Sequence, residues 1–312
     1  MYAVFQKELA DHLNSKRFTI FFGLIFMAGI FAIYLASQNI RSQVDPLTEF
    51  IFIKLFTTSG QSLPAFPFFI SLFIPIIGIA LGFDSINSEK TSGNLSRLIS
   101  QPIYRDAVIN GKFLAGLTIL SLIIVSMIAL VAGLGLRLIG VPPSSEEILR
   151  LIVFIITSII YGAFWLALSS LFSIVCDRAA TSMLASLAIW IFFFLFMSMI
   201  AGAITSAQIP IDQNSSADLI ARHYEISGMI SRISPSTLYG EATNALLMPE
   251  LGSLNPAMMM ISSITAGRML TSLSFSQSLL LIWPQLVSII ALAIICFAIS
   301  YIRFMRQEIR SM

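Results

Sequence analysis

The sequence predicts an all-α, polytopic membrane protein that crosses the bilayer six times. Of its 312 residues, 57% are hydrophobic and 11% are charged, whereas soluble domains carry about 25% charged residues. Long apolar runs without charges recur along the chain, and a helix of about 20 such residues spans the hydrocarbon layer. The expected spans are residues 18–40, 64–83, 113–136, 151–176, 179–204 and 279–302.

Ahead of the first span, residues 2–14 are predicted to form a short amphipathic helix. Phe5, Leu9 and Leu13 recur every four residues and share one face. Such a helix lies in the membrane surface rather than crossing it. The first span itself exceeds the apolar core of about 7–15 residues that is typical of a signal peptide, and Glu8 stands where a basic leader is expected. We therefore expect the first span to be retained.

A polar segment, residues 84–112, separates the second and third spans and must lie in water. A turn at Gly93 is expected to precede a short surface helix with Arg97 on its charged side. The helix ends before Pro102, because the residue before a proline avoids helical geometry. The apolar face of this helix is formed by three residues, Leu95, Leu98 and Ile99. This charged loop is the place where a soluble partner would bind.

The second half of the chain contains a tight hairpin and a long external loop. Only Cys176, Asp177 and Arg178 separate the fourth and fifth spans. The external loop, residues 205–278, holds apolar stretches near 217–231 and 237–248 that predict short interfacial helices capping an outward opening.

Two features of the external loop resemble metal ligands, but each has a simpler interpretation. His223 lies near Glu225, an arrangement that is usually a surface contact. Met258–Met260 could suit Cu(I), but three consecutive helical residues do not share a face. Cys176 and Cys296 are far apart and match no metal or disulfide spacing. The sequence therefore predicts no metal site and leaves the roles of His223 and Met258–Met260 open.

Six spans place both termini on the same side of the membrane. With that side in the cytoplasm, Lys and Arg in the short segments are more frequent inside than outside, as the positive-inside rule requires. The polar segment is then cytoplasmic. The net charge is only +2 and the chain has no basic run, so we expect no nucleic-acid partner.

The chain lacks the motifs of an energy-converting or hydrolytic enzyme. There is no P-loop, no H-E-x-x-H zinc motif and no G-x-S-x-G nucleophile motif. The apolar runs contain no charged residue, which argues against an ion-coupled carrier, since such carriers keep an intramembrane charge. A stand-alone secondary carrier or channel and a membrane-embedded enzyme remain as alternatives. The carrier would have to transport its cargo without ATP or a second protein. The enzyme would need a polar catalytic cluster at membrane depth, and the sequence offers none.

The polar segment carries a family pattern. FDSINSEKTSGNLSRLISQPIYRDAVINGKFLAG resembles the signature of type-2 ABC exporter permeases, the ABC-2 family, and most closely the branch of sodium-export and copper-processing permeases. The matching positions are Glu89, Lys90, Gly93, Leu95, Ser100, Pro102, Arg105, Gly111 and Lys112. Asn94 stands where the family usually has threonine. More loosely, KELADHLNSKRF resembles the family's elbow helix, and residues 234–247 resemble its external segment before the last span.

The resemblance implies a mechanism and a set of partners. Residues 1–312 would form one permease domain that pairs with a second permease chain, expected to be identical. Two copies of an ABC ATPase would bind beneath, carrying ATP and Mg, with no cofactor and no catalytic residue on this chain. The short helix of the polar segment would be the cytoplasmic coupling helix. The residues expected to couple to the ATPase are Glu89, Lys90, Gly93, Leu95, Arg97, Leu98, Pro102, Arg105 and Lys112.

The same resemblance implies an exporter in a prokaryotic cytoplasmic membrane, with both termini in the cytoplasm. The cargo cannot be assigned from the sequence, and no substrate-binding residue is proposed.

Overall fold

The computed structural model describes residues 1–16, 50–57, 65–91, 104–140, 142–212, 215–249 and 272–306, and scattered positions between 19 and 34. Every regular element in these ranges is a helix, which confirms the all-α prediction. The bounds of the expected first span, 18–40, lie outside the described residues. So do residues 92–103, which include the predicted short helix of the polar segment.

Five helices in the described ranges are long and apolar enough to cross a membrane. The chain is thus a multi-pass membrane protein, and each of the last five expected spans falls on one of these helices. The first, Phe66–Thr91, holds α4 (Phe66–Gly82) and α5 (Asn87–Thr91). The next two are α7 (Arg105–Ile139) and α8 (Ser145–Val175). The fourth runs continuously through α9 (Ala179–Ile191), η1 (Phe192–Phe196) and α10 (Met197–Gln208), and the fifth is α14 (Phe275–Arg306).

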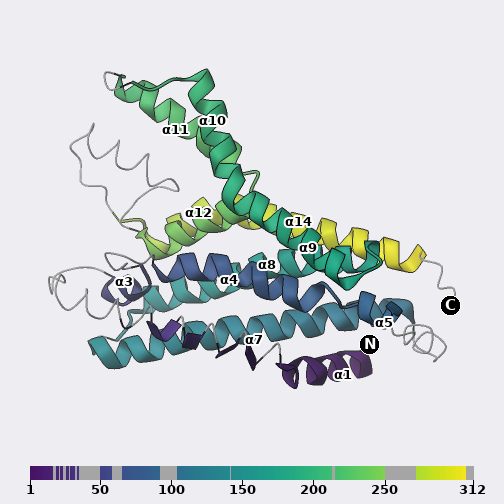
Figure 1. Ribbon diagram of the computed structural model, residues 1–312. Coiled ribbons are helices and arrows are strands. Elements are labelled where there is room, and N and C mark those ends of the chain that lie inside the picture. The colour runs from purple at the N-terminus through teal and green to yellow at the C-terminus, as the bar shows by residue number, and fades with distance from the viewer. Residues whose placement is uncertain are drawn as a thin grey trace.

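Helix α8 lies at the centre of the bundle. It packs against α4, α7, α14 and the short α12 (Pro235–Leu247). The N-terminal helix α1 (Tyr2–Leu13) lies along the start of α7, near α5 (Asn87–Thr91), while α3 (Ile51–Thr57) lies at the other end (Figure 1). We call the end with α1 and α5 the proximal end and the end with α3 the distal end. Helices α10 and α11 (Ala217–Ser231) pair with each other and project away from the bundle (Figure 1).

Glycines bring α4 and α8 into close contact. A Cβ atom at Gly78 would lie 3.0 Å from the carbonyl oxygen of Gly162, and one at Gly82 would lie 2.9 Å from that of Leu166. Gly78 and Gly82 form a G-x-x-x-G pattern, which lets helix backbones approach closely in membranes. These two glycines therefore let α4 pack directly against the backbone of α8.

Helix α12 is buried in the bundle rather than lying at an interface. The tyrosine ring of Tyr239 stacks on Tyr161 of α8 at 4.3 Å between centroids, and both side chains are fully buried. At the same contact, the hydroxyl oxygens of Ser158 and Tyr239 are 2.8 Å apart and form a hydrogen bond. The expected helices near 217–231 and 237–248 therefore exist as α11 and α12, but α12 belongs to the core.

The start of α8 is fixed by one carboxylate that serves two helices. Ser144 and Glu147 form a capping box, in which each side chain accepts a hydrogen bond from the other residue's N–H. The other oxygen of Glu147 accepts hydrogen bonds from the backbone N–H groups of Phe52 and Ile53, at 2.9 and 3.1 Å. Glu147 is 4% exposed, so its position fixes α3 relative to α8.

Candidate functional site

The polar segment begins at the proximal end, where its first residues are bound to α8. The hydroxyl oxygen of Ser173 accepts hydrogen bonds from the backbone N–H groups of Ile86 and Asn87, at 3.0 and 3.1 Å. Lys90 forms an ion pair with Asp177, in the turn between α8 and α9, at 2.9 Å. The hydrogen bond from Lys90 lowers the pKa of the exposed Asp177 carboxyl. The predicted tight hairpin after α8 is therefore in contact with the polar segment.

Three charged side chains from distant parts of the sequence meet at this end. The ammonium group of Lys112 lies 2.9 Å from a carboxylate oxygen of Glu8 and 2.9 Å from one of Glu89. The side chains of Lys112, Glu89 and Glu8 are only 7%, 11% and 13% exposed. We call these three residues the ion triad. It joins α1, α5 and α7 at a single point.

Steric contact supports the same junction. A Cβ atom at Gly111 would lie 3.1 Å from Cβ of Val4 and 3.3 Å from the backbone nitrogen of Phe5. Val4 is the buried residue of α1. Two adjacent residues of α7 therefore hold α1. Gly111 has no side chain and lets the backbone of α7 approach Val4, and Lys112 forms an ion pair with Glu8.

The triad is a strong but demanding contact. Charges removed from water must be paired, since an unpaired buried charge costs several kcal/mol. One lysine ammonium has three donors and can satisfy two carboxylates at once. His12, one turn beyond Glu8, lies beside the same group. Burial lowers the pKa of His12. The Glu8 carboxylate raises this pKa and the charge of Lys112 lowers it, so the two act in opposite directions.

A family model described as ABC-2 family transporter protein matches residues 2–309. The chain belongs to the ABC-2 family. A relative described as a probable ABC transporter permease protein, NosY, from Pseudomonas aeruginosa is 25% identical over 205 residues, which cover 64% of this chain and 68% of that protein. The chain is thus the permease subunit of an ABC transporter, and permeases of this class work with an ABC ATPase. The predicted family is confirmed.

The structure places four of the predicted coupling residues in this ABC-2 permease. Glu89 and Lys112 belong to the ion triad, Lys90 pairs with Asp177, and Arg105 is the first residue of α7. The other predicted coupling residues lie outside the described ranges: Gly93, Leu95, Arg97, Leu98 and Pro102. Sequence reasoning missed Glu8 as a partner of Lys112, because nothing local in the sequence marks a pair of residues so far apart.

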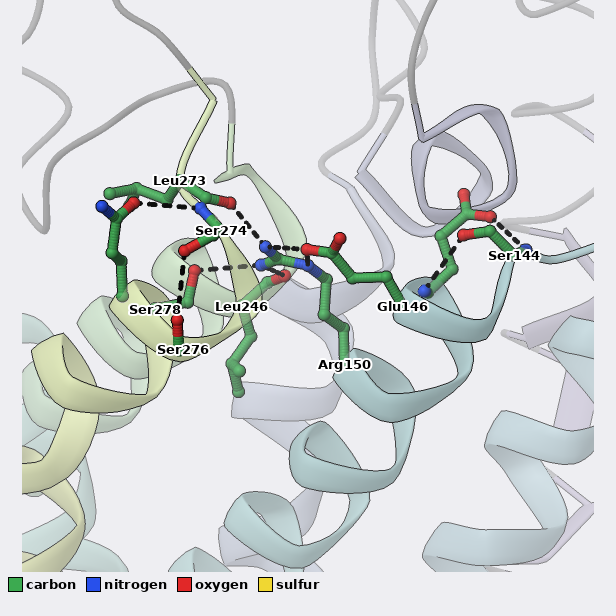
Figure 2. A network of polar contacts seen from close by, with 10 residues as sticks. Ser144, Glu146, Arg150, Leu246, Leu273, Ser274, Ser276 and Ser278 are labelled. Carbon is green, nitrogen blue, oxygen red and sulfur yellow. Dashed lines mark hydrogen bonds and ion pairs between the residues drawn. The ribbon is translucent and has the colours of Figure 1, made fainter.

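The distal end of the permease contains a second polar network, shown in Figure 2. The guanidinium of Arg150 is fully buried, and it donates to Glu146, to the carbonyl oxygens of Leu246 and Leu273, and to the hydroxyl of Ser278. It ties α8 to α12 and to the start of α14. The network has a structural role, because the guanidinium has no contact with solvent.

Helix α12 contributes a buried carboxylate, that of Glu241, to the bundle. Arg232 donates to both carboxylate oxygens of Glu241 at 3.0 Å, and the amide of Gln285 in α14 donates to one of them at 3.0 Å. Glu241 is 7% exposed. The permease therefore carries a buried carboxylate that the charge-free runs of the sequence did not reveal, but Arg232 neutralises it.

Other features singled out in the sequence have plain structural roles. A nitrogen of the His223 ring lies 2.8 Å from the carbonyl oxygen of Ile209, which places it at the end of α10. Cys176 and Cys296 are free and half-buried. No group of three or more His, Cys, Asp or Glu in the described ranges is placed to hold a metal ion. Met258–Met260 lies outside those ranges.

A small cavity adjoins the ion triad. It has a volume of about 10 Å³ and is lined in part by Lys112 and by three serines, Ser85, Ser170 and Ser300. This space holds about one water molecule. It is too small for a cargo, and the rest of its lining is apolar, including Ile109 and Phe297.

Proposed function

We propose that this permease serves an ATP-driven exporter and that the polar segment, 84–112, couples it to a separate ATPase. The observation that carries the proposal is the anchoring of both ends of residues 92–103. The residues before this stretch are tied to α8 and, through Glu89, to Lys112 of α7. The residues after it run directly into α7, which crosses the bundle from end to end (Figure 1). A push on residues 92–103 is therefore delivered to two long helices at once.

The family resemblance supplies the contacts that residues 92–103 would make. Leu95, Leu98 and Ile99 would fill an apolar cleft on the ATPase, and Arg97 would fix the register by pairing with charge there. ATP and Mg would bind the ATPase, so this chain would carry no cofactor and perform no covalent chemistry. Closure of the ATPase around ATP would then drive the spans between inward-facing and outward-facing states.

We propose that two copies of this chain pair, above two copies of the ATPase, and that the cargo passes between the paired chains. Packing supports this arrangement. The centre of the described bundle is filled by large side chains with no exposed surface, including Phe154, Tyr161 and Trp165. The span 179–208 leaves apolar residues such as Leu184 and Met199 67% exposed, and these need lipid or protein around them.

The proximal end is proposed to face the cytoplasm of a prokaryotic cell. The positive-inside bias of the short segments supports this orientation. It places α1, the polar segment and the α8–α9 turn on the side where ATP is available, and it places α11 and α12 toward the outside.

The proposal is tested by co-expressing the tagged permease with a candidate ABC ATPase from the same organism. The ATPase is expected to co-purify in detergent, and Arg97→Ala is expected to weaken the complex and lower ATP hydrolysis by the reconstituted pair. Arg222→Ala, on the exposed face of α11, is the matched control. Transport of cargo by the permease alone in liposomes, without ATP or a second protein, would support the stand-alone carrier instead.

A further inference from the structure

We propose that Ser234 is a positioning residue for the span 179–208, because its hydroxyl group holds this span in a bent form at η1. The hydrogen bond from Ser234 to Phe193 is called the latch, and the hairpin of α10 and α11 beyond η1 is called the arm. When the latch opens, η1 becomes an ordinary α-turn and the arm changes direction. The inference rests on the proposed function in one respect, since the open and the closed latch are assigned to different states of the ATP-driven cycle.

The span changes its helical form at η1. Residues Phe192–Phe196 make a single π-turn between α9 and α10. Such turns are rare, occur mostly inside α-helices and are frequent at functional sites, and they bend the helix that contains them. In this permease η1 marks the point where the span leaves the bundle. Helix α9 packs against α8 and α4, whereas α10 packs mainly against α11 and projects away (Figure 1).

The backbone hydrogen bonds of η1 deprive one carbonyl group of its usual donor. In an α-helix the N–H of Met197 would donate to the carbonyl oxygen of Phe193, four residues earlier. Here it donates instead to the carbonyl oxygen of Phe192, five residues earlier. The hydroxyl of Ser234 donates to the Phe193 oxygen at 3.0 Å. The latch therefore supplies the donor that the π-turn takes away.

Ser234 serves η1 rather than its own helix. It occupies the N-cap of α12, where a serine side chain usually accepts a hydrogen bond from a backbone N–H of the first turn, but it makes no such bond. Because Ser234 is fully buried, its hydroxyl faces little competition from water, and a hydrogen bond in such surroundings is strengthened. Removing the hydroxyl favours the α-turn, in which Met197 regains its usual acceptor.

The latch joins the two ends of the arm at one place. The arm begins at η1 and ends at residues 232–234. At that second end, Arg232 donates to both carboxylate oxygens of Glu241 in α12, and Glu241 accepts a further hydrogen bond from Gln285 of α14. Residues 232–234 are therefore fixed to the core of the bundle, and opening the latch changes the arm at its η1 end alone.

The aromatic rings beside η1 show that the closed form carries a cost. The indole N–H of Trp190, on the turn before η1, is buried and has no hydrogen-bond partner in the described part of the chain, which is unfavourable. The ring of Trp190 stacks on that of Phe194 in η1, with the centroids 5.6 Å apart. A change of helical form at η1 would move Phe194 and let the indole turn toward an acceptor. Because the closed form carries this cost, one hydrogen bond is enough to decide between the two forms.

The latch is tested by measuring spin-label distances between the arm and the bundle in the permease in lipid nanodiscs. Labels at Ser206→Cys on α10 and Ser145→Cys on α8, both at exposed positions, report the direction of the arm, in a protein carrying Cys176→Ser and Cys296→Ala. A second pair, Thr118→Cys on α7 with Ser145→Cys, lies within the bundle and is the reference. Position 206 lies about 15 Å beyond η1 along α10, so a change of about 20° in the bend moves it by about 5 Å.

Ser234→Ala removes the latch, and Ser236→Ala is the matched control, because the hydroxyl of Ser236 bonds to Tyr161 rather than to η1. Loss of one buried hydrogen bond shifts an equilibrium between two forms about fivefold. We expect Ser234→Ala to enlarge a population whose 145–206 distance differs by about 5 Å, while the 118–145 distance stays constant. Equal 145–206 distributions in Ser234→Ala and Ser236→Ala would overturn the inference and leave the proposed function untouched.

ATP provides a second test that needs no change at Ser234. In the complex with a candidate ATPase that binds but does not hydrolyse ATP, we expect ATP to enlarge the same population that Ser234→Ala enlarges. If the complex forms and the permease stimulates hydrolysis by the active ATPase, but ATP leaves the 145–206 distance unchanged, the inference is overturned and the proposed function stands. If no complex forms, the proposed function fails, and the comparison of Ser234→Ala with Ser236→Ala still decides whether the latch holds the arm.

Discussion

The sharpest prediction about the fold concerns Arg150, the centre of the distal network. Its side chain is fully buried, and its donors reach the oxygens of Leu246 at 3.1 Å, Leu273 at 2.6 Å and Ser278 at 3.0 Å. It also forms a bond of 2.8 Å to Glu146 (Figure 2). Arg150→Met keeps most of the volume and removes every donor.

The expected cost follows from the groups that lose their donor. Leaving a buried acceptor unsatisfied costs about 1–3 kcal/mol, and removing one member of a buried charged network costs about 3–5 kcal/mol. Glu146 is 37% exposed and regains water, so its share is small. We therefore expect Arg150→Met to lower the free energy of unfolding by about 3 kcal/mol, which is more than a hundredfold in the equilibrium constant.

The assay is reversible unfolding in mixed micelles, with Glu146→Gln as the control variant. Because Glu146 is partly exposed, Glu146→Gln should cost less than about 1 kcal/mol. A cost for Arg150→Met as small as that of the control would refute the reasoning, because it would mean that the oxygens of Leu246, Leu273 and Ser278 find other donors or need none.

Three further predictions concern single contacts. Gly82→Ala should cost about 1–3 kcal/mol in unfolding free energy by overpacking α4 against α8, whereas Gly202→Ala, which meets nothing within 4 Å, should be tolerated; equal melting temperatures would contradict this. Glu147→Gln removes one acceptor of the capping box, so hydrogen exchange of the 144–148 amides should speed up, and unchanged exchange would show that the cap is dispensable. Burial lowers the pKa of His12, so the docking of α1 should be fully stable above about pH 6.5, the ordinary value, and should weaken as the pH falls below it. Fluorescence of a probe on α1 should report this weakening, His12→Asn should flatten the profile, and docking that strengthens on acidification would contradict the assignment.

Hydropathy predicted the long helices well because their burial depends on local composition. The predicted span 113–136 lies within α7, and α8 and α9 are separated by the predicted tight turn. The burial of α12 was not predictable in this way. Its sequence is mixed, and Glu241 can be buried only because Arg232 and Gln285 supply partners from other helices.

The ion triad shows the same limit at the candidate site. The family pattern pointed to Glu89 and Lys112, but it could not reveal that these two residues meet each other and Glu8 inside the protein. That pairing depends on how α1 folds back onto α7, which Gly111 permits and no local motif encodes. The assignment of Arg97 and its neighbours to the ATPase interface stays a prediction.

The most direct test of the coupling account is photocrosslinking from position 97. A photoreactive residue replacing Arg97 in the membrane-embedded complex should crosslink to the ATPase subunit, and the yield should change when ATP binds. The same residue at position 222 on α11 should give no such product. Crosslinking to the ATPase from position 222 but not from position 97 would contradict the account, because it would place the polar segment on the wrong side of the membrane.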